Sequence, residues 1–565
     1  MNFIKERILV FKFIIIMISV TLLFTLSQTD LTNFYFLVYM PLMIIVYLIL
    51  RYSLRINLLN RYISYIFSII LAIITVGKVL ENVNIHFSVV IIGEIIVSII
   101  GLTLIFERTF QVLIQLSIKG KSFISKEENG ISWKESFFLI LFGWIIYLLP
   151  FLPGNVAGDG NFQLIEFFGY ASMTNHHPFL STIFEGGLLD IGKHLLGDEF
   201  GLFFYVVVQL LICCSIYSFC ISKISKLGIN KKICITFSIF IALAPYWSFV
   251  SETLHKDGMF IAFFALFITL LVMITVQLFI DKTNITKKQL ALFVISCLLV
   301  CFWRNDGIYM VVPPIIGLIF VNKRQYWKQF VGVLLTVLLV YIGFNRVLLP
   351  ALNVAPTEKR EALSLPVQQT ARYMKYYPNE VTVHERKVLK NTFNNFDDLA
   401  KVYTPNDADP TKFNLKDQFN VKKYIETWLQ MGLRHPGVYI AATFEGTNAY
   451  YTPWLPAQTF SWCGDISSWS KPSFLNLHYF TPKILRTSFI KFVNGVASLP
   501  FVNILLSDSL AILICLLMAL FMWTKIGFKY VIPIIPIFMN LLVCIASPIN
   551  GLIRYSGCII FATYC

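Results

Sequence analysis

The stretch DGMFIAFFALFITLLVMITVQLFI spans residues 257–280, and after Asp257 it contains no charged side chain. An α-helix rises about 1.5 Å per residue, so a run of this length covers the roughly 30 Å hydrocarbon core of a bilayer. A helix that is apolar on all sides has to be surrounded by protein or by lipid. We therefore predict that residues 257–280 cross a membrane.

Similar apolar runs recur along the 565-residue chain, which is 57% hydrophobic and only 14% charged. Soluble proteins carry nearer a quarter of charged residues, so lipid must solvate much of this chain. The runs predict an all-α polytopic membrane protein with about 13–14 transmembrane helices. We place the other spans near 8–27, 33–50, 61–80, 86–106, 135–152, 200–222, 233–250, 288–303, 306–320, 329–350, 500–523 and 529–546, with a last, short one from 552 to 565.

Lysine and arginine are distributed unevenly between the loops that join these spans. With the N-terminus in the cytoplasm, every second short loop is rich in positive charge, as shown by Arg51, Arg108, Lys223, Lys282, Lys328 and Lys525. Positive charge marks cytoplasmic loops, whereas long loops cross the membrane regardless of charge. The pattern predicts a multi-pass protein of the cell membrane with loops 153–199 and 351–499 outside the cytoplasm. It also explains the formal net charge of +15 without a nucleic-acid partner.

The predicted spans and loops divide the chain into four parts. Residues 1–132 form an N-terminal four-helix transmembrane extension, and residues 133–350 form a transmembrane core that includes the first outer loop. Residues 351–499 are polar, rich in turn-forming Pro, Asn and Asp, and long enough for a small extracytoplasmic domain. Residues 500–565 hold the C-terminal transmembrane helices.

The first outer loop gathers residue types that bind polar groups. Asp159 stands between two glycines, Gln163 lies near the start of an amphipathic segment, and His176 and His177 come just before a proline. A carboxylate, an amide and two imidazoles at a membrane surface suit a polar lipid headgroup. The same residues equally suit a plain helix start, because Asp and Asn cap helices and Pro favours the first turn.

Three cations are predicted on the same membrane face. Lys256 lies between two spans, Arg304 lies in the break between two unusually short spans, and Arg554 opens the final span. Fixed cations there suit a phosphate, and arginine adds a two-pronged hydrogen bond. The alternative is that each cation reaches the headgroups or pairs with a neighbouring aspartate.

The large outer loop contains residue types that suit a carbohydrate. Its segment EALSLPVQQTARY (361–373) holds Gln368, Gln369 and Arg372, and aromatic residues follow in the same loop. Amides and aromatic rings suit sugar hydroxyls and sugar faces, although aromatic side chains also anchor proteins at membrane surfaces. The chain lacks GxxxxGK[ST], HExxH and GxSxG, so no motif predicts cytoplasmic nucleotide chemistry.

Together these motifs resemble a bacterial family of polytopic membrane proteins of unknown function. The resemblance runs from about Leu149 to the end of the chain. It rests on LPxxPG before Asp159, NHHP at 175–178, HKDG at 255–258, WRNDGIY at 303–309 and EALSLPVQQTARY at 361–373. That family is in turn similar to GT-C glycosyltransferases, which use sugars carried on polyprenyl phosphate.

The GT-C resemblance implies a role for each candidate residue. An Asp or Glu in the first outer loop is essential in such enzymes, so Asp159 is expected to be the catalytic base, although Gly160 stands where many relatives place a second acid. The residues expected to bind the donor phosphate are Lys256, Arg304, Arg554, His176 and His177. The residues expected to bind substrate are Gln163, Gln368, Gln369 and Arg372. Some GT-C enzymes use Mg or Mn and others use no cofactor, which leaves open whether Asp159, His176 and His177 hold a divalent cation.

The resulting hypothesis is a membrane glycosyltransferase. It would transfer a sugar from a polyprenyl-phosphate carrier to a cell-envelope glycan on the extracytoplasmic face. A transporter or flippase of a lipid-linked saccharide is one alternative, and it would need charged side chains within the spans, where Lys78 and Glu94 are the main candidates. A non-catalytic partner in envelope assembly is another, and it would tolerate the loss of Asp159, Lys256 and Arg304 alike.

Overall fold

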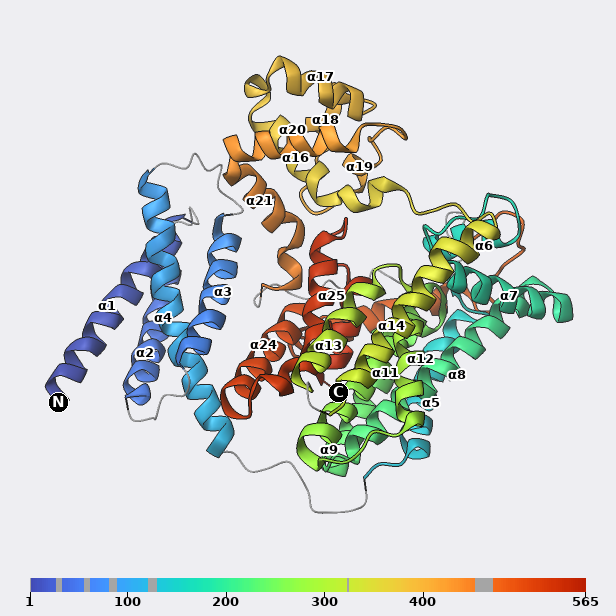
Figure 1. Cartoon of the computed structure of the whole chain (residues 1–565), viewed down its shortest axis with the longest axis horizontal. Coiled ribbons are helices and arrows are strands. Elements are labelled where there is room, and N and C mark those ends of the chain that lie inside the picture. Colours follow the sequence, from blue (N-terminus) through green and yellow to red (C-terminus); the bar gives the residue numbers. More distant parts are fainter. Residues whose placement is uncertain are drawn as a thin grey trace.

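Helices make up nearly all the regular structure of this computed structural model (Figure 1). The structure describes residues 2–26, 33–54, 61–80, 89–119, 130–322, 325–452 and 471–564. Within these residues, seven helices are long and apolar enough to cross a membrane. The prediction of an all-α, multi-pass membrane protein is therefore confirmed. The other predicted spans are also helices, but they are shorter or less apolar, so the total of 13–14 stays a prediction.

The first four helices form a group of their own, which Figure 1 shows beside the rest of the molecule. They are α1 (Asn2–Leu26), α2 (Asn33–Ser53), α3 (Arg61–Leu80) and α4 (Val89–Lys119). Side chains from all four share a hydrophobic core that includes Leu9, Met43, Ala72 and Leu102. This group packs against the remaining chain mainly through α3, which contacts later helices.

The central bundle is built around α11 (Lys256–Val276), which contains most of the apolar stretch that predicted the fold. In the most apolar part of this span, 78% of the residues are buried inside the protein, because neighbouring helices surround it. The other helices are α5 (Trp133–Leu148), α6 (Gly158–Phe167), α7 (Phe179–Leu196), α8 (Asp198–Ser225), α9 (Lys231–Leu243), α10 (Pro245–Ser251), α12 (Lys287–Trp303), α13 (Gly307–Val321), α14 (Trp327–Gly343), α15 (Leu349–Ala351), α24 (Asp508–Lys525), α25 (Ile535–Ala546) and α26 (Ile553–Tyr564).

The large loop segment folds into helices that lie above the bundle in Figure 1. They are α16 (Ser364–Tyr376), α17 (Val383–Thr392), α18 (Leu399–Val402), α19 (Asp409–Lys412), α20 (Val421–Arg434) and α21 (Pro436–Thr447). We call α16–α21 the outer helices, after the prediction that residues 351–499 lie outside the cytoplasm. They have a hydrophobic core of their own, whose residues all come from 363–439. Two further helices, α22 (Lys483–Ala497) and α23 (Pro500–Leu505), lead from them back to α24.

Two predicted spans are interrupted where the sequence carries a helix-breaking signal. The span 233–250 bends by 59° between α9 and α10, because Pro245 has no amide hydrogen and holds Ala244 in an extended conformation. The span predicted at 500–523 is divided into α23 and α24, with Ser507 at the N-cap of α24. The apolar span itself therefore begins at Asp508, later than predicted.

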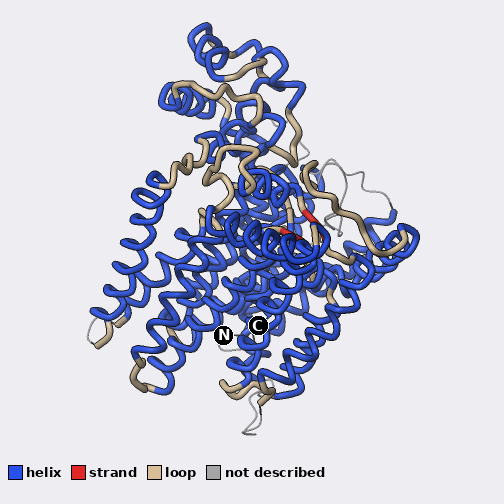
Figure 2. Tube along the Cα trace, turned by 90° about the vertical axis from the view of Figure 1, so that its right-hand side faces the viewer, coloured by secondary structure: helices blue, strands red, loops and turns tan. Residues whose placement is uncertain are grey.

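Two short parallel strands position the candidate site, and they appear in red in Figure 2. Strand β1 (Asn155–Val156) pairs with β2 (Thr253–Leu254) so that Asn155 lies opposite Thr253. Each strand leads within two residues into a helix, β1 into α6 and β2 into α11. The pairing therefore brings the N-termini of α6 and α11 side by side, although about a hundred residues separate them in the chain.

Candidate functional site

The strand register aligns two similar segments, NVAGDG at 155–160 and TLHKDG at 253–258. Each has an aspartate as the second residue of its helix, followed by a glycine. A Cβ on Gly160 would lie 2.2 Å from the carbonyl oxygen of Leu254, and one on Gly258 would lie 2.5 Å from that of Val250. No side chain fits at either position without displacing backbone. This close packing explains why residue 160 is a glycine.

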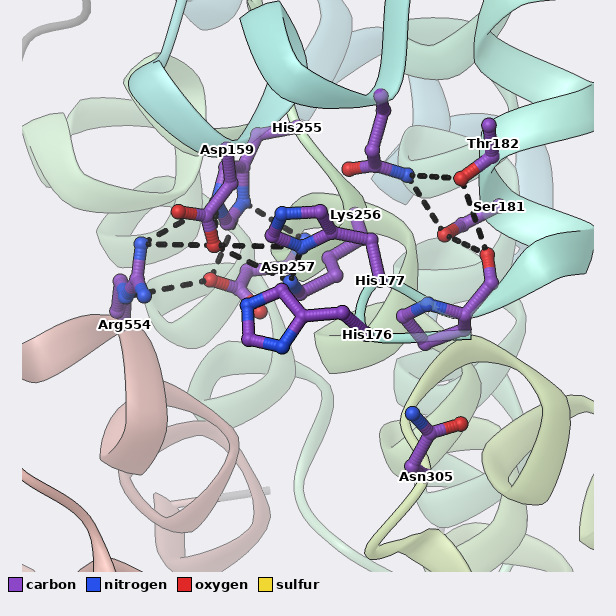
Figure 3. Close-up of polar contacts among 12 residues, drawn as sticks. Asp159, His176, His177, Ser181, Thr182, His255, Lys256, Asp257, Asn305 and Arg554 are labelled. Carbon is purple, nitrogen blue, oxygen red and sulfur yellow. Dashed lines mark hydrogen bonds and ion pairs between the residues drawn. The ribbon is translucent and has the colours of Figure 1, made fainter. Parts of the chain in front are cut away.

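Asp159 is the centre of a cluster of charges at these two helix N-termini (Figure 3). Its Oδ2 atom lies 3.1 Å from Lys256 Nζ and 3.2 Å from Arg554 Nη1. The carboxylate side chain keeps 23% of its surface exposed, so it remains within reach of a ligand. Burial alone would raise the pKa of Asp159, but Lys256 and Arg554 outweigh it and hold the pKa well below its usual value. The three predicted residues Asp159, Lys256 and Arg554 are thus brought together.

His255 and Asp257 also belong to this cluster, although the sequence did not single them out. His255 caps α11, and its Nδ1 accepts a hydrogen bond from the backbone N–H of Asp257 at 3.1 Å. The same Nδ1 lies 3.1 Å from Asp257 Oδ2, and Nε2 lies 3.4 Å from both Asp159 Oδ2 and Arg554 Nη1. The buried carboxylate of Asp257 lies on the other side, with its Oδ2 3.9 Å from Arg554 Nε. The Asp-Gly pair at 257–258, which repeats the one at 159–160, is a sequence signal for Asp257, and His255 lies in the same HKDG segment.

The two histidines of the first outer loop lie at different distances from the cluster. His177 is buried, and its Nδ1 lies 2.8 Å from Lys256 Nζ. Burial, and then the charge of Lys256, hold the pKa of His177 well below its usual value, so its ring is a neutral acceptor for the ammonium group. His176 is 42% exposed, and its Nδ1 lies 4.0 Å from Oε1 of Glu361, near the outer helices. Only His177 therefore reaches the charge cluster.

Asn175 holds this histidine segment in place through several hydrogen bonds. Its backbone N–H donates to Ala355 at 2.7 Å, and its carbonyl accepts from the side chain of Asn305 at 2.7 Å. Its amide donates to Asn345 at 3.3 Å, and its side-chain oxygen accepts from the N–H of Phe179 at the start of α7. Asn175 thus contributes to the start of α7, although Pro178 is the N-cap residue, and this role coexists with the contact between His177 and Lys256.

Arg304 is placed apart from Asp159. Its Nη2 atom pairs with Asp306 Oδ2 at 2.9 Å, and its guanidinium carbon lies 4.9 Å from the ring centroid of Phe260 and 5.4 Å from that of Tyr555. Among the residues that the structure describes, no ion pair joins Arg304 to Asp159. Arg304 therefore pairs with a neighbouring aspartate, which was the alternative to phosphate binding. The Tyr555 ring lies near both guanidinium groups, 5.4 Å from that of Arg304 and 4.9 Å from that of Arg554.

Gln163 contacts a buried polar group between α6 and α7, which includes the labelled Ser181 and Thr182 in Figure 3. Its amide contacts the hydroxyls of Ser181 at 2.9 Å and Thr182 at 3.1 Å. With the amide oxygen toward these hydroxyls, the nitrogen donates to Glu185 at 3.2 Å. Burial raises the pKa of Glu185 well above its usual value, and Lys256 offsets this only in part. This arrangement holds α6 against α7 rather than pointing an amide at Asp159.

The chain matches one family model across residues 169–565, and that family is DUF6020, a family of unknown function. The chain belongs to DUF6020. The match leaves out α1–α4 and begins after Asp159, so it includes Lys256, Arg304 and Arg554 but not the central carboxylate. No curated protein and no solved structure matches the chain. The predicted membership of a membrane family of unknown function is confirmed, and the likeness to GT-C enzymes stays a prediction.

The predicted substrate residues of the outer helices all lie in α16 of this DUF6020 protein, and all are buried. Gln368 donates to the carbonyl of Thr404 at 2.6 Å, and Gln369 donates to Thr443 at 2.9 Å. Arg372 pairs with Glu445. In this arrangement their polar groups are used in holding the outer helices together.

The outer helices are also bonded to the turn that leads into α26. The N–H of Ala408 donates to the carbonyl of Pro548 at 2.7 Å. The buried amide of Asn550 donates to the carbonyl of Glu445 at 2.8 Å and to the side chain of Asn448 at 2.9 Å. Arg554 follows in the first turn of α26. The outer helices therefore help to set the position of a cation in the charge cluster.

The side chains proposed as metal ligands do not fit a divalent cation in this arrangement. The ammonium group of Lys256 already lies between Asp159 Oδ2, at 3.1 Å, and His177 Nδ1, at 2.8 Å. Within the described ranges, no group of three or more His, Cys, Asp or Glu side chains is arranged to hold a metal ion. The cluster itself supplies the positive charge that a metal would otherwise bring.

Proposed function

We propose that this DUF6020 protein is a membrane glycosyltransferase. It would transfer a sugar from a polyprenyl-phosphate carrier to a cell-envelope glycan on the extracytoplasmic face. The observation that carries the proposal is the partly exposed Asp159 carboxylate, which lies between Lys256 and Arg554 at the end of an apolar span. A base beside two fixed cations is what sugar transfer from a phosphate requires.

The position of the cluster along α11 supports a lipid phosphate as the leaving group. Lys256 is the first residue of the apolar span Lys256–Asp281. The end of such a span lies at the level of the lipid headgroups, where a carrier anchored by its prenyl chain presents its phosphate. The N-termini of α6 and α11 add partial positive charge at the same place, which favours an anion further.

The proposed reaction uses Asp159 as a general base. An acceptor hydroxyl oxygen would attack the anomeric carbon while its proton moves to Asp159. The bond between the anomeric carbon and the phosphate oxygen breaks, and its electron pair remains on the phosphate. Lys256 and Arg554 would stabilise this charge, with Arg304 adding positive potential from near the Tyr555 ring. Inversion at the anomeric carbon is expected from the GT-C resemblance.

The outer helices are the proposed acceptor-selecting part. His176 and Glu361 lie between the charge cluster and the outer helices, and both side chains are partly exposed. Lys412 of α19 holds Glu361 at 2.9 Å, which ties this edge to the outer helices. A glycan that contacts the outer helices would therefore reach Asp159 past His176 and Glu361.

The test is a comparison of cell-envelope glycans from wild type, a deletion strain, Asp159→Asn and Asp190→Asn, with the membrane level of each variant measured. Asp190 is a matched control, because it lies in the same outer loop and, among the residues that the structure describes, pairs with His194 and not with the charge cluster. We expect the deletion and Asp159→Asn to lose the same sugar while Asp190→Asn keeps it. A deletion that changes the glycan while Asp159→Asn does not would reject the base role and favour transport of the lipid-linked saccharide.

A further inference from the structure

Two carboxylates share Arg554, and they differ in exposure. Asp159 Oδ2 lies 3.2 Å from Nη1 of Arg554, and the Asp159 side chain is 23% exposed. Asp257 Oδ2 lies 3.9 Å from Nε, and the Asp257 side chain is only 2% exposed. A ligand that arrives from outside meets Asp159 first and does not reach Asp257.

Contacts of the surrounding backbone fix the position of Asp257 at the start of α11. Its N–H donates to His255 Nδ1, and the glycine that follows it packs against the carbonyl of Val250. The strand pairing between β1 and β2 fixes the start of α11 relative to α6. The Asp257 carboxylate is therefore held in place whether or not Asp159 keeps its ion pairs.

Arg554 and Asp257 are placed to pair more closely if Asp159 is withdrawn. Nε of Arg554 and Oδ2 of Asp257 are both buried, and neither makes a hydrogen bond among the described residues, although Oδ2 also lies 3.1 Å from His255 Nδ1. A buried guanidinium without a counter-ion is strongly destabilising. A small movement of Arg554 toward Asp257 would form the missing hydrogen bond and keep the guanidinium paired.

We infer that a lipid phosphate binds this site by exchange, displacing Asp159 from Lys256 and Arg554 while Asp257 remains the fixed counter-ion of Arg554. The inference rests on the proposed function for its ligand class. It makes Asp257 a positioning residue that acts through Arg554. It also means that donor binding frees Asp159 from the two cations that keep it a weak base, so the base becomes active only when the donor is bound.

Binding of a short-chain polyprenyl monophosphate to the purified full-length protein in nanodiscs tests the exchange. The probe carries no sugar, and the corresponding prenyl alcohol is the control for binding through the chain alone. We expect Asp159→Asn to bind the phosphate roughly tenfold more tightly than wild type, because the phosphate no longer has to displace a carboxylate. Unchanged or weaker binding by Asp159→Asn would overturn the exchange.

Asp257→Asn separates a positioning role from a purely structural one. Without Asp257, Asp159 becomes the only carboxylate on Arg554 and is harder to displace, so we expect phosphate binding to weaken and transfer to fall roughly 100-fold while thermal stability is kept. The acid limb of the pH–rate profile should also move to lower pH, because Asp159 remains beside its cations. A parallel loss of thermal stability, with the pH profile unmoved, would reject the positioning role.

The two hypotheses fail separately in these experiments. Tighter phosphate binding by Asp159→Asn with no glycan change in the deletion strain would support the exchange and reject the glycosyltransferase. Loss of a sugar in Asp159→Asn cells without tighter phosphate binding would support the glycosyltransferase and reject the exchange.

Discussion

At the scale of single residues, the pair Asp-Gly has the same structural role at the start of three helices. The glycines of α6, α11 and α13 each lie so close to a backbone carbonyl that a Cβ would be 2.2–2.5 Å from its oxygen. For Gly307 that oxygen belongs to Val300. The aspartate before each glycine is then fixed at a helix N-terminus, where its negative charge is favoured. Close backbone packing thus positions all three carboxylates.

This role of glycine predicts a large effect of a very small substitution. Gly160→Ala should lower the free energy of unfolding by about 1–3 kcal/mol, because the added methyl group has to displace the carbonyl of Leu254 or the start of α6. Thermal unfolding in detergent measures the effect. Gly187→Ala is the matched control, since Gly187 is a helical glycine with open space around its Cβ position. Equal stability of the two variants would show that α6 does not pack on β2 in this way.

At the scale of helices, local patterns predicted most elements, and tertiary contacts decided the rest. Apolar runs and capping residues are local, so the predicted spans fall on helices in the described residues, although 233–250 and 500–523 are each divided into two. The meeting of Asp159 with Lys256 depends on the register of β1 and β2, which two-residue strands do not reveal in sequence. Gln163 and Gln368 have buried partners from distant segments, and residue type alone does not identify such partners.

The pair of helices α6 and α7 provides a test through its buried acid. The raised pKa of Glu185 means that the folded state holds this proton more tightly than the unfolded chain. Stability from this proton is complete below the unfolded pKa of about 4.3, and it is lost at about 1.4 kcal/mol per pH unit as pH rises toward the folded pKa. Glu185→Gln removes this loss, so it should be more stable than wild type at pH 7, with the advantage shrinking toward pH 4.

Thermal unfolding of wild type and Glu185→Gln measures this difference. The pH should run from roughly 4, near the unfolded pKa, to roughly 8. Glu426→Gln is the control, because Glu426 of α20 is exposed and its replacement should give no growing advantage. A constant difference between Glu185→Gln and wild type across the range would contradict a buried, protonated Glu185.

At the scale of the whole molecule, the membrane span that begins at the charge cluster separates the parts of the protein on the two sides of the membrane. Residues Lys256–Asp281 form one apolar span, and at about 1.5 Å per residue its ends lie roughly a bilayer apart. The charge cluster and the outer helices lie toward the Lys256 end, and the loop after Asp281 lies at the other (Figure 1). Lysine-rich loops predict that this other end is cytoplasmic.

Cysteine labelling in right-side-out membrane vesicles tests this orientation. Val383 at the start of α17 is 89% exposed, and Thr283, in the loop after Asp281, is exposed at the opposite end. The nine cysteines of the described residues are buried, so a background with Cys463→Ser and Cys565→Ser suits the experiment. We expect an impermeant maleimide to label Val383→Cys in sealed vesicles and Thr283→Cys only after permeabilisation. The reverse pattern would place the Asp159 cluster in the cytoplasm, where the proposed transfer to a cell-envelope glycan has no acceptor.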